Sequence, residues 1–215
     1  MLSEEHEQLD EQSAVSKKQR RDQLLDAAVS AILKYGMATS MDQIAAEANI
    51  TKPILYRHFK DRAGLLAALE RRYEDILVTK LVNALSAYPI TSSHNAKALL
   101  WSTIECYVNF VYENLEIYRF LTRQELTERE IDRLELPRRI STLVASVIHD
   151  ALDRNKVDPT PATLWAYGIV GMIHLAADWW IDHQEITKEK TVEELSRLLW
   201  YGLKAVTLGD QAHRL

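Results

Sequence analysis

The residues best suited to binding chemistry lie in one short stretch, residues 51–60, with the sequence TKPILYRHFK. This stretch combines a hydroxyl, two ammonium groups, a guanidinium, a phenol and an imidazole within ten residues. Such groups donate hydrogen bonds to phosphate oxygens and to the acceptor atoms of base edges. The composition of the stretch therefore favours contact with a nucleic acid.

Two short helices joined by a tight turn are predicted to position these groups. Ser40 and Gln43 form a capping-box pattern, which starts a first helix at the next residue. Asn49 tolerates the left-handed conformation that a sharp turn requires. Thr51 is then expected to cap a second helix with its side chain, and Pro53 fits the first turn of that helix. This layout is that of a helix-turn-helix reader of DNA.

Residues 17–66 resemble the DNA-binding domain of the TetR family of bacterial regulators. That domain carries an opening helix followed by a motif of the form T…IA…A…Y.HF..K..L. The chain matches the motif at Thr39, Ile44-Ala45, Ala48, Tyr56, His58-Phe59 and Leu65-Leu66. It departs from the family at Asn49, where Gly is frequent, and at Arg62-Ala63, where Lys-Glu is frequent. Asn tolerates the same backbone shape and Arg keeps the charge, so both departures are compatible with the resemblance.

The resemblance and the local patterns together predict an all-α fold of about nine helices. A three-helix helix-turn-helix domain is expected over residues 16–62, followed by a larger helical effector-binding and dimerisation domain over residues 63–209. Residues 1–15 are rich in acids and lack a sustained apolar pattern, so they are expected to form a disordered tail. Outside the two short helices, helical patterns cover residues 17–35, 62–87, 95–114, 116–124, 137–155, 160–183 and a last segment that contains Thr191 and ends near Gly209.

Charge is unevenly distributed along the chain, whose formal net charge is −5. Residues 17–72 hold eleven Lys or Arg and six Asp or Glu, whereas residues 1–16 hold five acids and no Lys or Arg. Because only the local surface meets phosphate, the basic segment supports a DNA-binding role in an acidic chain. The basic run at residues 17–21 fits either an arm toward the DNA backbone or a solvated start of a helix.

Ten residues in and around the two short helices are expected to contact DNA. The second helix would offer groups to base edges and thymine methyls, and the first helix and the flanking positions would hold phosphates. In chain order, these residues are Thr39, Ser40, Thr51, Lys52, Pro53, Leu55, Tyr56, His58, Lys60 and Arg62. The expected partner is a near-palindromic double-stranded operator, with half-sites about 34–36 Å apart or a near multiple of that distance.

All five tryptophans lie in the second region of the chain. Large aromatic side chains fit either an ordinary helical core or an apolar pocket for a small molecule. The family resemblance implies an effector site in this region, and the candidates for its lining are Trp101, Tyr107, Phe110, Tyr118, Trp165, His174, Asp178 and Trp179. The segment GIVGMIHLAADWWIDH loosely resembles family members that sense acyl-CoA or fatty acids. A planar drug or another aromatic compound suits the same residues, so the expectation is a small hydrophobic effector.

The last two long helices are expected to form a homodimer. Gly168 and Gly171 would let a second helix approach closely, and an apolar stripe on the last helix is formed by Leu195, Leu199 and Leu203. In the resembled family the corresponding helices make a four-helix bundle across a twofold axis. The alternative is that both helices pack only within their own subunit.

Several other kinds of chemistry receive little support. His174, Asp178 and Asp182 share a helix face, but a His–Asp pair or a polar spot in the pocket is favoured over a metal site. The single Cys106 excludes a disulfide within one chain and fits a reducing compartment. No apolar run reaches ~18 residues, so no membrane contact is expected, and the expected location is cytoplasmic. No cofactor is expected either.

The function that these patterns favour is a ligand-controlled repressor of transcription. Two alternatives remain at this stage: an architectural DNA-binding protein without an effector, and an activator. An enzyme is disfavoured because the sequence shows no Ser/His/Asp or metal-ligand constellation.

Overall fold

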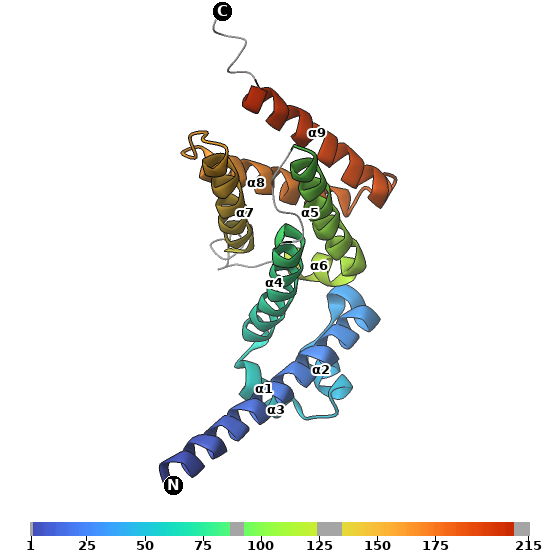
Figure 1. Cartoon of the computed structure of the whole chain (residues 1–215). Helices are drawn as coiled ribbons and strands as arrows, with labels where there is room; N and C mark the ends of the chain where they lie inside the picture. The colour runs from blue at the N-terminus through green and yellow to red at the C-terminus, as the bar shows by residue number, and fades with distance from the viewer. Residues whose placement is uncertain (1, 87–92, 124–134, 209–215) are drawn as a thin grey trace, which may run out of the picture. The chain divides into compact units, whose positions relative to one another are not determined.

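The computed structural model describes residues 2–86, 93–123 and 135–208, and its elements are shown in Figure 1. Within these ranges the chain forms nine α-helices, one short 3-10 helix and no strand. The all-α prediction is therefore confirmed. The chain divides into two compact units. We call residues 1–73 with 116–124 the N-terminal unit, and residues 74–115 with 125–215 the C-terminal unit.

The N-terminal unit contains five helices and the first half of a sixth. They are α1 (Leu2–Tyr35), η1 (Gly36–Ala38), α2 (Met41–Glu47), α3 (Lys52–Phe59), the part of α4 (Arg62–Ser86) up to Tyr73, and α6 (Leu115–Thr122). The predicted domain boundary at residues 62 and 63 thus differs from the division of the structure, which falls inside α4. The inclusion of α6 in this unit was not anticipated.

Helix α1 begins at Leu2, so the structure describes a helix in the segment that was expected to form a disordered tail. Residues 1–35 contain neither Gly nor Pro, and nothing in this sequence interrupts the helix. Glu4 and Glu5 lie near the start of this helix and Lys34 lies in its last turn, an order that complements the helix dipole. Composition suggested disorder for the acidic segment, whereas in the structure the helix over residues 17–35 continues through it.

The helix-turn-helix is built largely by the local rules that the sequence predicts. The Ser40–Gln43 capping box starts α2, and Asn49 turns the chain with a φ of 53°. Thr51 is the N-cap of α3, but its side chain makes no capping hydrogen bond, contrary to expectation. Its carbonyl oxygen instead accepts from the N–H groups of the following turn. The Asp61 carboxylate accepts a hydrogen bond from the Gly64 N–H and so caps α4.

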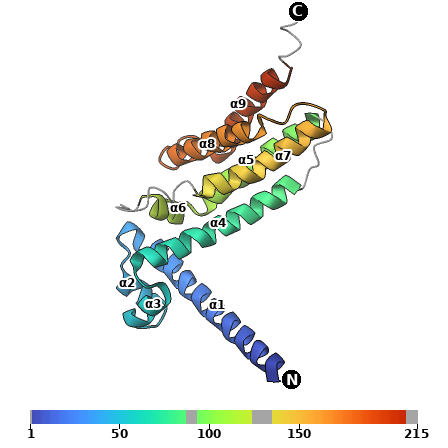
Figure 2. The ribbon, with the colours of Figure 1, turned by 90° about the vertical axis from the view of Figure 1, so that its left-hand side faces the viewer.

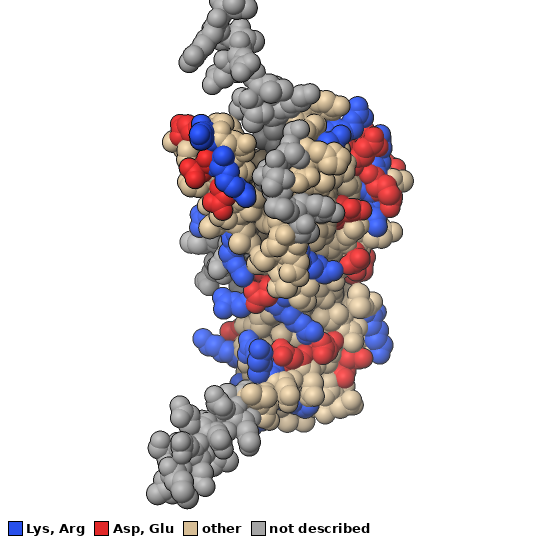
Figure 3. Space-filling view, viewed as in Figure 1, with Lys and Arg blue, Asp and Glu red and all other residues tan. Residues whose placement is uncertain are grey.

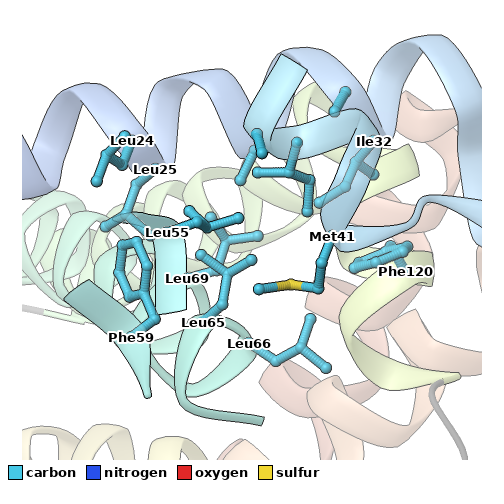
Figure 4. Close-up of a cluster of buried hydrophobic side chains, with 14 of the residues drawn as sticks. Leu24, Leu25, Ile32, Met41, Leu55, Phe59, Leu65, Leu66, Leu69 and Phe120 are labelled. Carbon is cyan, nitrogen blue, oxygen red and sulfur yellow. The ribbon is translucent and has the colours of Figure 1, made fainter. Parts of the chain in front are cut away.

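The core of the N-terminal unit is one cluster of apolar side chains from α1, α2, α3, α4 and α6, drawn in Figure 4. Leu55 and Phe59 of α3 face Leu24 and Leu25 of α1 in this view. From α6, Ile117 and Phe120 belong to the same cluster, and both are almost fully buried. The core therefore joins the two helices of the DNA-reading motif to a helix that lies some sixty residues later in the sequence.

The C-terminal unit contains the second half of α4 with α5 (Ser93–Glu113), α7 (Glu135–Arg154), α8 (Ala162–Trp180) and α9 (Lys188–Leu208). Helix α7 packs along α8, and α5 packs against α9, as Figures 1 and 2 both show. Trp180 is buried between these helices, stacks on Tyr112 and donates a hydrogen bond from Nε1 to the Ile186 carbonyl. Arg139 of α7 pairs with Glu74 and Asp75 of α4, which ties α4 to this unit.

Candidate DNA interface

Helix α3 presents a polar face to solvent and an apolar face to the core. Thr51, Pro53 and Tyr56 are exposed, and Lys52 is partly exposed, as a recognition helix requires. Leu55 has no exposed surface, so the expectation that it contacts a base is wrong. The helical period places Leu55 with Phe59, four residues later, on the side that faces α1 and α4.

The hydroxyls at the start of α2 are used inside the protein. Thr39 is 2% exposed and donates its hydroxyl proton to the Gly36 carbonyl at 2.6 Å. The prediction that Thr39 contacts phosphate is therefore wrong. Ser40 is half-buried, and its hydroxyl both donates to Gln43 Oε1 and accepts from the Gln43 N–H. Its only hydroxyl proton is thus already committed to the capping box.

Arg62 also has an internal role. Its guanidinium donates to the Thr39 carbonyl at 2.7 Å and lies over the Phe120 ring, 5.8 Å from the ring centre. This side chain therefore connects the start of α2 with α6. Arg62 is therefore used at least in part inside the protein, and its contact with the DNA backbone stays a prediction.

The end of α3 carries a second group of basic residues. Lys60 is exposed and ends the helix with a φ of 70°. Burial lowers the pKa of His58, and the nearby charges of Arg57, Arg20 and Arg21 lower it further. His58 is therefore neutral near pH 7 and is suited to hydrogen bonding rather than to charge pairing with phosphate.

Two contacts of this surface were not predicted from the sequence. Arg21 donates to the His58 carbonyl at 3.0 Å and stacks over Phe59, so it fixes the end of α3 to α1. Asp42 forms an ion pair with Lys52 at 2.8 Å. Both contacts join residues that are distant in sequence, and only the packing of α1, α2 and α3 brings them together.

Acidic groups lie beside the basic groups of α3, because Asp42 pairs with Lys52 and Asp61 follows Lys60. Elsewhere, on the face shown in Figure 3, Lys and Arg are likewise interspersed with Asp and Glu. The candidates for DNA contact are therefore individual exposed groups on α3, of which Thr51, Lys52 and Tyr56 are the best placed.

Family models match both units. Residues 24–69 match a model described as "Bacterial regulatory proteins, tetR family". Residues 81–214, more than half of the chain, match a model described as "Tetracyclin repressor-like, C-terminal domain". This chain belongs to the TetR family. The resemblance seen in the sequence is thereby confirmed, and with it the role of a DNA-binding transcriptional regulator.

Individual TetR-family relatives agree with this assignment. The HTH-type transcriptional regulator Rv0472c of Mycobacterium tuberculosis is 29% identical over 188 residues, which cover 87% of this chain and 78% of the relative. The HTH-type transcriptional activator FasR of Mycolicibacterium smegmatis is 28% identical and covers 88% of this chain, with 85% of the relative matched. A solved TetR-like regulator from Rhodococcus sp. RHA1 has 29% identity and a TM-score of 0.60, covering 86% of this chain and 95% of that structure.

The effector-site candidates of this TetR-family chain do not form one group. Tyr107 of α5 and His174 of α8 meet, with the phenol oxygen 2.9 Å from His174 Nδ1. Phe110 is buried, and Trp101 and Trp165 are half-buried. That these five residues line one effector site stays a prediction.

Three other candidates lie elsewhere. Asp178 and Trp179 are exposed at the end of α8, where the Trp179 ring stacks on His183 at 3.9 Å. Exposure of both side chains contradicts their assignment to the interior of a pocket. Tyr118 belongs to α6 and hence to the N-terminal unit. Among the described residues, no group of three or more His, Cys, Asp or Glu is arranged to hold a metal.

The dimer candidates of α8 and α9 separate into exposed and internal positions. Gly168 and Gly171 are exposed, and a Cβ added at either would meet no atom within 4 Å. Leu195 is half-buried, and Leu199 is buried within the unit. Leu199 therefore faces the chain's own core, and among the described side chains of α9 the exposed large apolar ones are Leu198 and Tyr201.

The side chain of Leu203 lies outside the described residues. Among the residues that the structure does describe, no helix combines the length and the apolar character needed to cross a membrane.

Proposed function

We propose that this chain is a ligand-responsive repressor that binds a palindromic operator as a homodimer. The observation that carries the proposal is the exposed polar face of α3, held by a rigid core in a unit of the TetR type. Thr51, Lys52 and Tyr56 enter the major groove, and Lys60 contacts the flanking phosphates. Pro53 lies beside them and offers an apolar surface to a thymine methyl.

A dimer is supported by the exposed apolar face of α8. Leu164 and Leu175 are 75% and 71% exposed, and Tyr167 and Trp179 are also exposed. The glycines on this helix leave room for another helix to approach. Members of the family typically dimerise. The exposed apolar face of α8 could pack against the same face of a second copy across a twofold axis. Two α3 helices would then meet successive major grooves.

The effector site is proposed for the interior of the C-terminal unit, around Tyr107 and His174. The two helices that carry this hydrogen-bonded pair also bury apolar side chains, among them Val108, Phe110 and Ile173. A small hydrophobic effector would gain from the apolar surroundings, and its polar end would be oriented by the phenol and the imidazole. Acyl-CoA and fatty acids fit this description, as do aromatic compounds.

Communication between effector and DNA is proposed to run through α4 and α6. Helix α4 belongs to both units, and α6 belongs to the N-terminal unit although α5 and α7 on either side of it in sequence do not. Arg62 connects α6 to the start of α2 by its contacts with Phe120 and the Thr39 carbonyl. An effector must bind the conformation with low DNA affinity more tightly than the other one, since otherwise no equilibrium is displaced.

Activation is the second candidate function, because the relative FasR is named as a transcriptional activator. The two functions differ in the position of the operator relative to the promoter and in the sign of the response. Both require the same DNA-binding unit.

The experiment that tests the proposal is selection of fragments of the source genome by the purified full-length chain. Sequencing is expected to return one palindromic motif, and a reporter under its control should be less active when the chain is present. Binding without sequence preference, falling uniformly with salt, would instead indicate the architectural alternative. Higher reporter activity in the presence of the chain would establish activation.

A further inference from the structure

The ion pair between Asp42 and Lys52 lies at the start of both helices of the DNA-reading motif. Asp42 is in the first turn of α2, and Lys52 is the first residue of α3. Lys52 Nζ donates to Asp42 Oδ2 at 2.8 Å, and the two side chains are 41% and 70% exposed, respectively. The pair therefore presents a cation and a carboxylate side by side on the surface that carries Thr51 and Tyr56.

The folding of the unit accounts for only a small part of this arrangement, through the favourable position of a carboxylate in the first turn of α2. An ion pair this exposed adds little to stability, because water and salt screen it. The start of α2 is already capped by Ser40 and Gln43, and the core is closed by other residues. A carboxylate at this position also repels phosphate, so it weakens any binding that depends on charge alone.

The pair does match the chemistry of one base pair. In the major groove, a C·G pair presents the N7 and O6 acceptors of guanine next to the N4 amino donor of cytosine. An ammonium group donates to the first two atoms, and a carboxylate accepts from the third. An A·T pair instead places the N6 amino donor of adenine where the ammonium group needs the second acceptor, and the O4 acceptor of thymine where the carboxylate needs a donor.

We infer that Asp42 is a specificity-determining residue, which reads a C·G base pair in each half-site together with Lys52 and disfavours duplexes that lack this pair. The inference rests on the proposed function, because it requires that α3 enter the major groove. Lys52 keeps its contact with Asp42 in the complex, so that each group orients the other at the base edge.

The test is a binding series on the operator selected from the genome. Each position of the half-site is substituted symmetrically, and dissociation constants are measured by fluorescence anisotropy for the wild type and for Asp42→Ala. The wild type should show one position at which replacement of C·G weakens binding by about 5- to 100-fold. Asp42→Ala should lose most of this preference and bind unrelated duplexes more tightly.

Two further variants make the result specific. Glu47→Gln removes a negative charge from the other end of α2, where Glu47 pairs with Lys34, and should leave every base preference unchanged. Asp42→Asn should move the preference at the same position toward A·T, because an amide pairs with the N6 and N7 atoms of adenine. Circular dichroism and thermal unfolding of each variant should match the wild type.

The outcomes separate this inference from the proposed function. If Asp42→Ala changes the affinity for all duplexes by one common factor, the residue acts only through charge and the inference is overturned, while the repressor proposal stands. The inference about Asp42 would also be overturned if binding by the wild type depended on C·G at no position of the half-site. A wild type that selects no operator would overturn both.

Discussion

Helices α3 and α8 each leave one face exposed, but the chemistry of the two faces is opposite. The face of α3 offers a hydroxyl, an ammonium group and a phenol, while its leucine is fully buried. The face of α8 offers Leu164 and Leu175 with aromatic side chains between them and beyond. A polar exposed face suits a highly charged partner, and an apolar one suits a second protein surface. The proposal therefore assigns DNA contact to the N-terminal unit and self-association to the C-terminal unit.

The largest expected effect comes from placing a charge on the apolar face of α8. Leu175→Glu should convert the dimer to a monomer, because a carboxylate would be buried without a partner at the twofold interface. Operator affinity should then fall by about 10²- to 10⁴-fold, since two linked DNA contacts become one. Sedimentation velocity and anisotropy measure the two effects. Val157→Glu alters an exposed apolar residue between α7 and α8 and serves as the control. A dimeric Leu175→Glu protein would contradict this role for α8.

The buried side of α3 provides the second test. Leu55→Ala should lower the free energy of unfolding by about 2–5 kcal/mol, because it removes a fully buried side chain from the core of the N-terminal unit. Urea denaturation measures this effect. Pro53→Ala, on the exposed side of the same helix, should change stability far less. Equal losses for both variants would mean that α3 does not have the two distinct faces described.

The exposed side of α3 provides the third test. Lys52→Ala and Tyr56→Ala should each weaken operator binding by about 1–3 kcal/mol, the range for a direct base contact. Neither should change the mass of the dimer or the helical content. Gel-shift titration gives the affinities, and wild-type affinity in both variants would refute the proposed contact surface.

The smallest expected effect concerns His174 in the interior of the C-terminal unit. Burial lowers the pKa of His174 below 6.5, and the nearby Asp178 only partly opposes this. The unfolded state therefore binds more protons than the folded state below pH 6.5, and stability should fall as the pH falls through that region. One group contributes at most about 1.4 kcal/mol per pH unit. Urea midpoints at pH 7.0 and 5.5 should differ less for His174→Gln than for the wild type; an unchanged difference would contradict the assignment.

The sequence was sufficient to predict features that depend on local spacing. The capping box at Ser40, the turn at Asn49 and the cap at Asp61 all follow from neighbouring residues. The ends of most helices were predicted for the same reason. Family resemblance added the division into a DNA-binding unit and a larger helical unit.

Features that depend on tertiary contacts could not be predicted from the sequence. Thr39 and Arg62 both look like phosphate ligands, but they bond to each other through the Thr39 carbonyl, 23 residues apart. The stacking of Arg62 on Phe120 spans a still longer separation in sequence. Side chains with the chemistry of a DNA ligand can thus be engaged in contacts inside the protein. For Arg62, the position of α6 in the structure shows such a contact.

Operator binding by a twofold dimer is tested most directly by native mass spectrometry of the full-length chain with its selected operator, combined with hydroxyl-radical footprinting of the same complex. We expect an even number of chains on each duplex and protection of two symmetric half-sites about one helical turn apart or a near multiple. A single chain on each duplex, or protection without twofold symmetry, would contradict it.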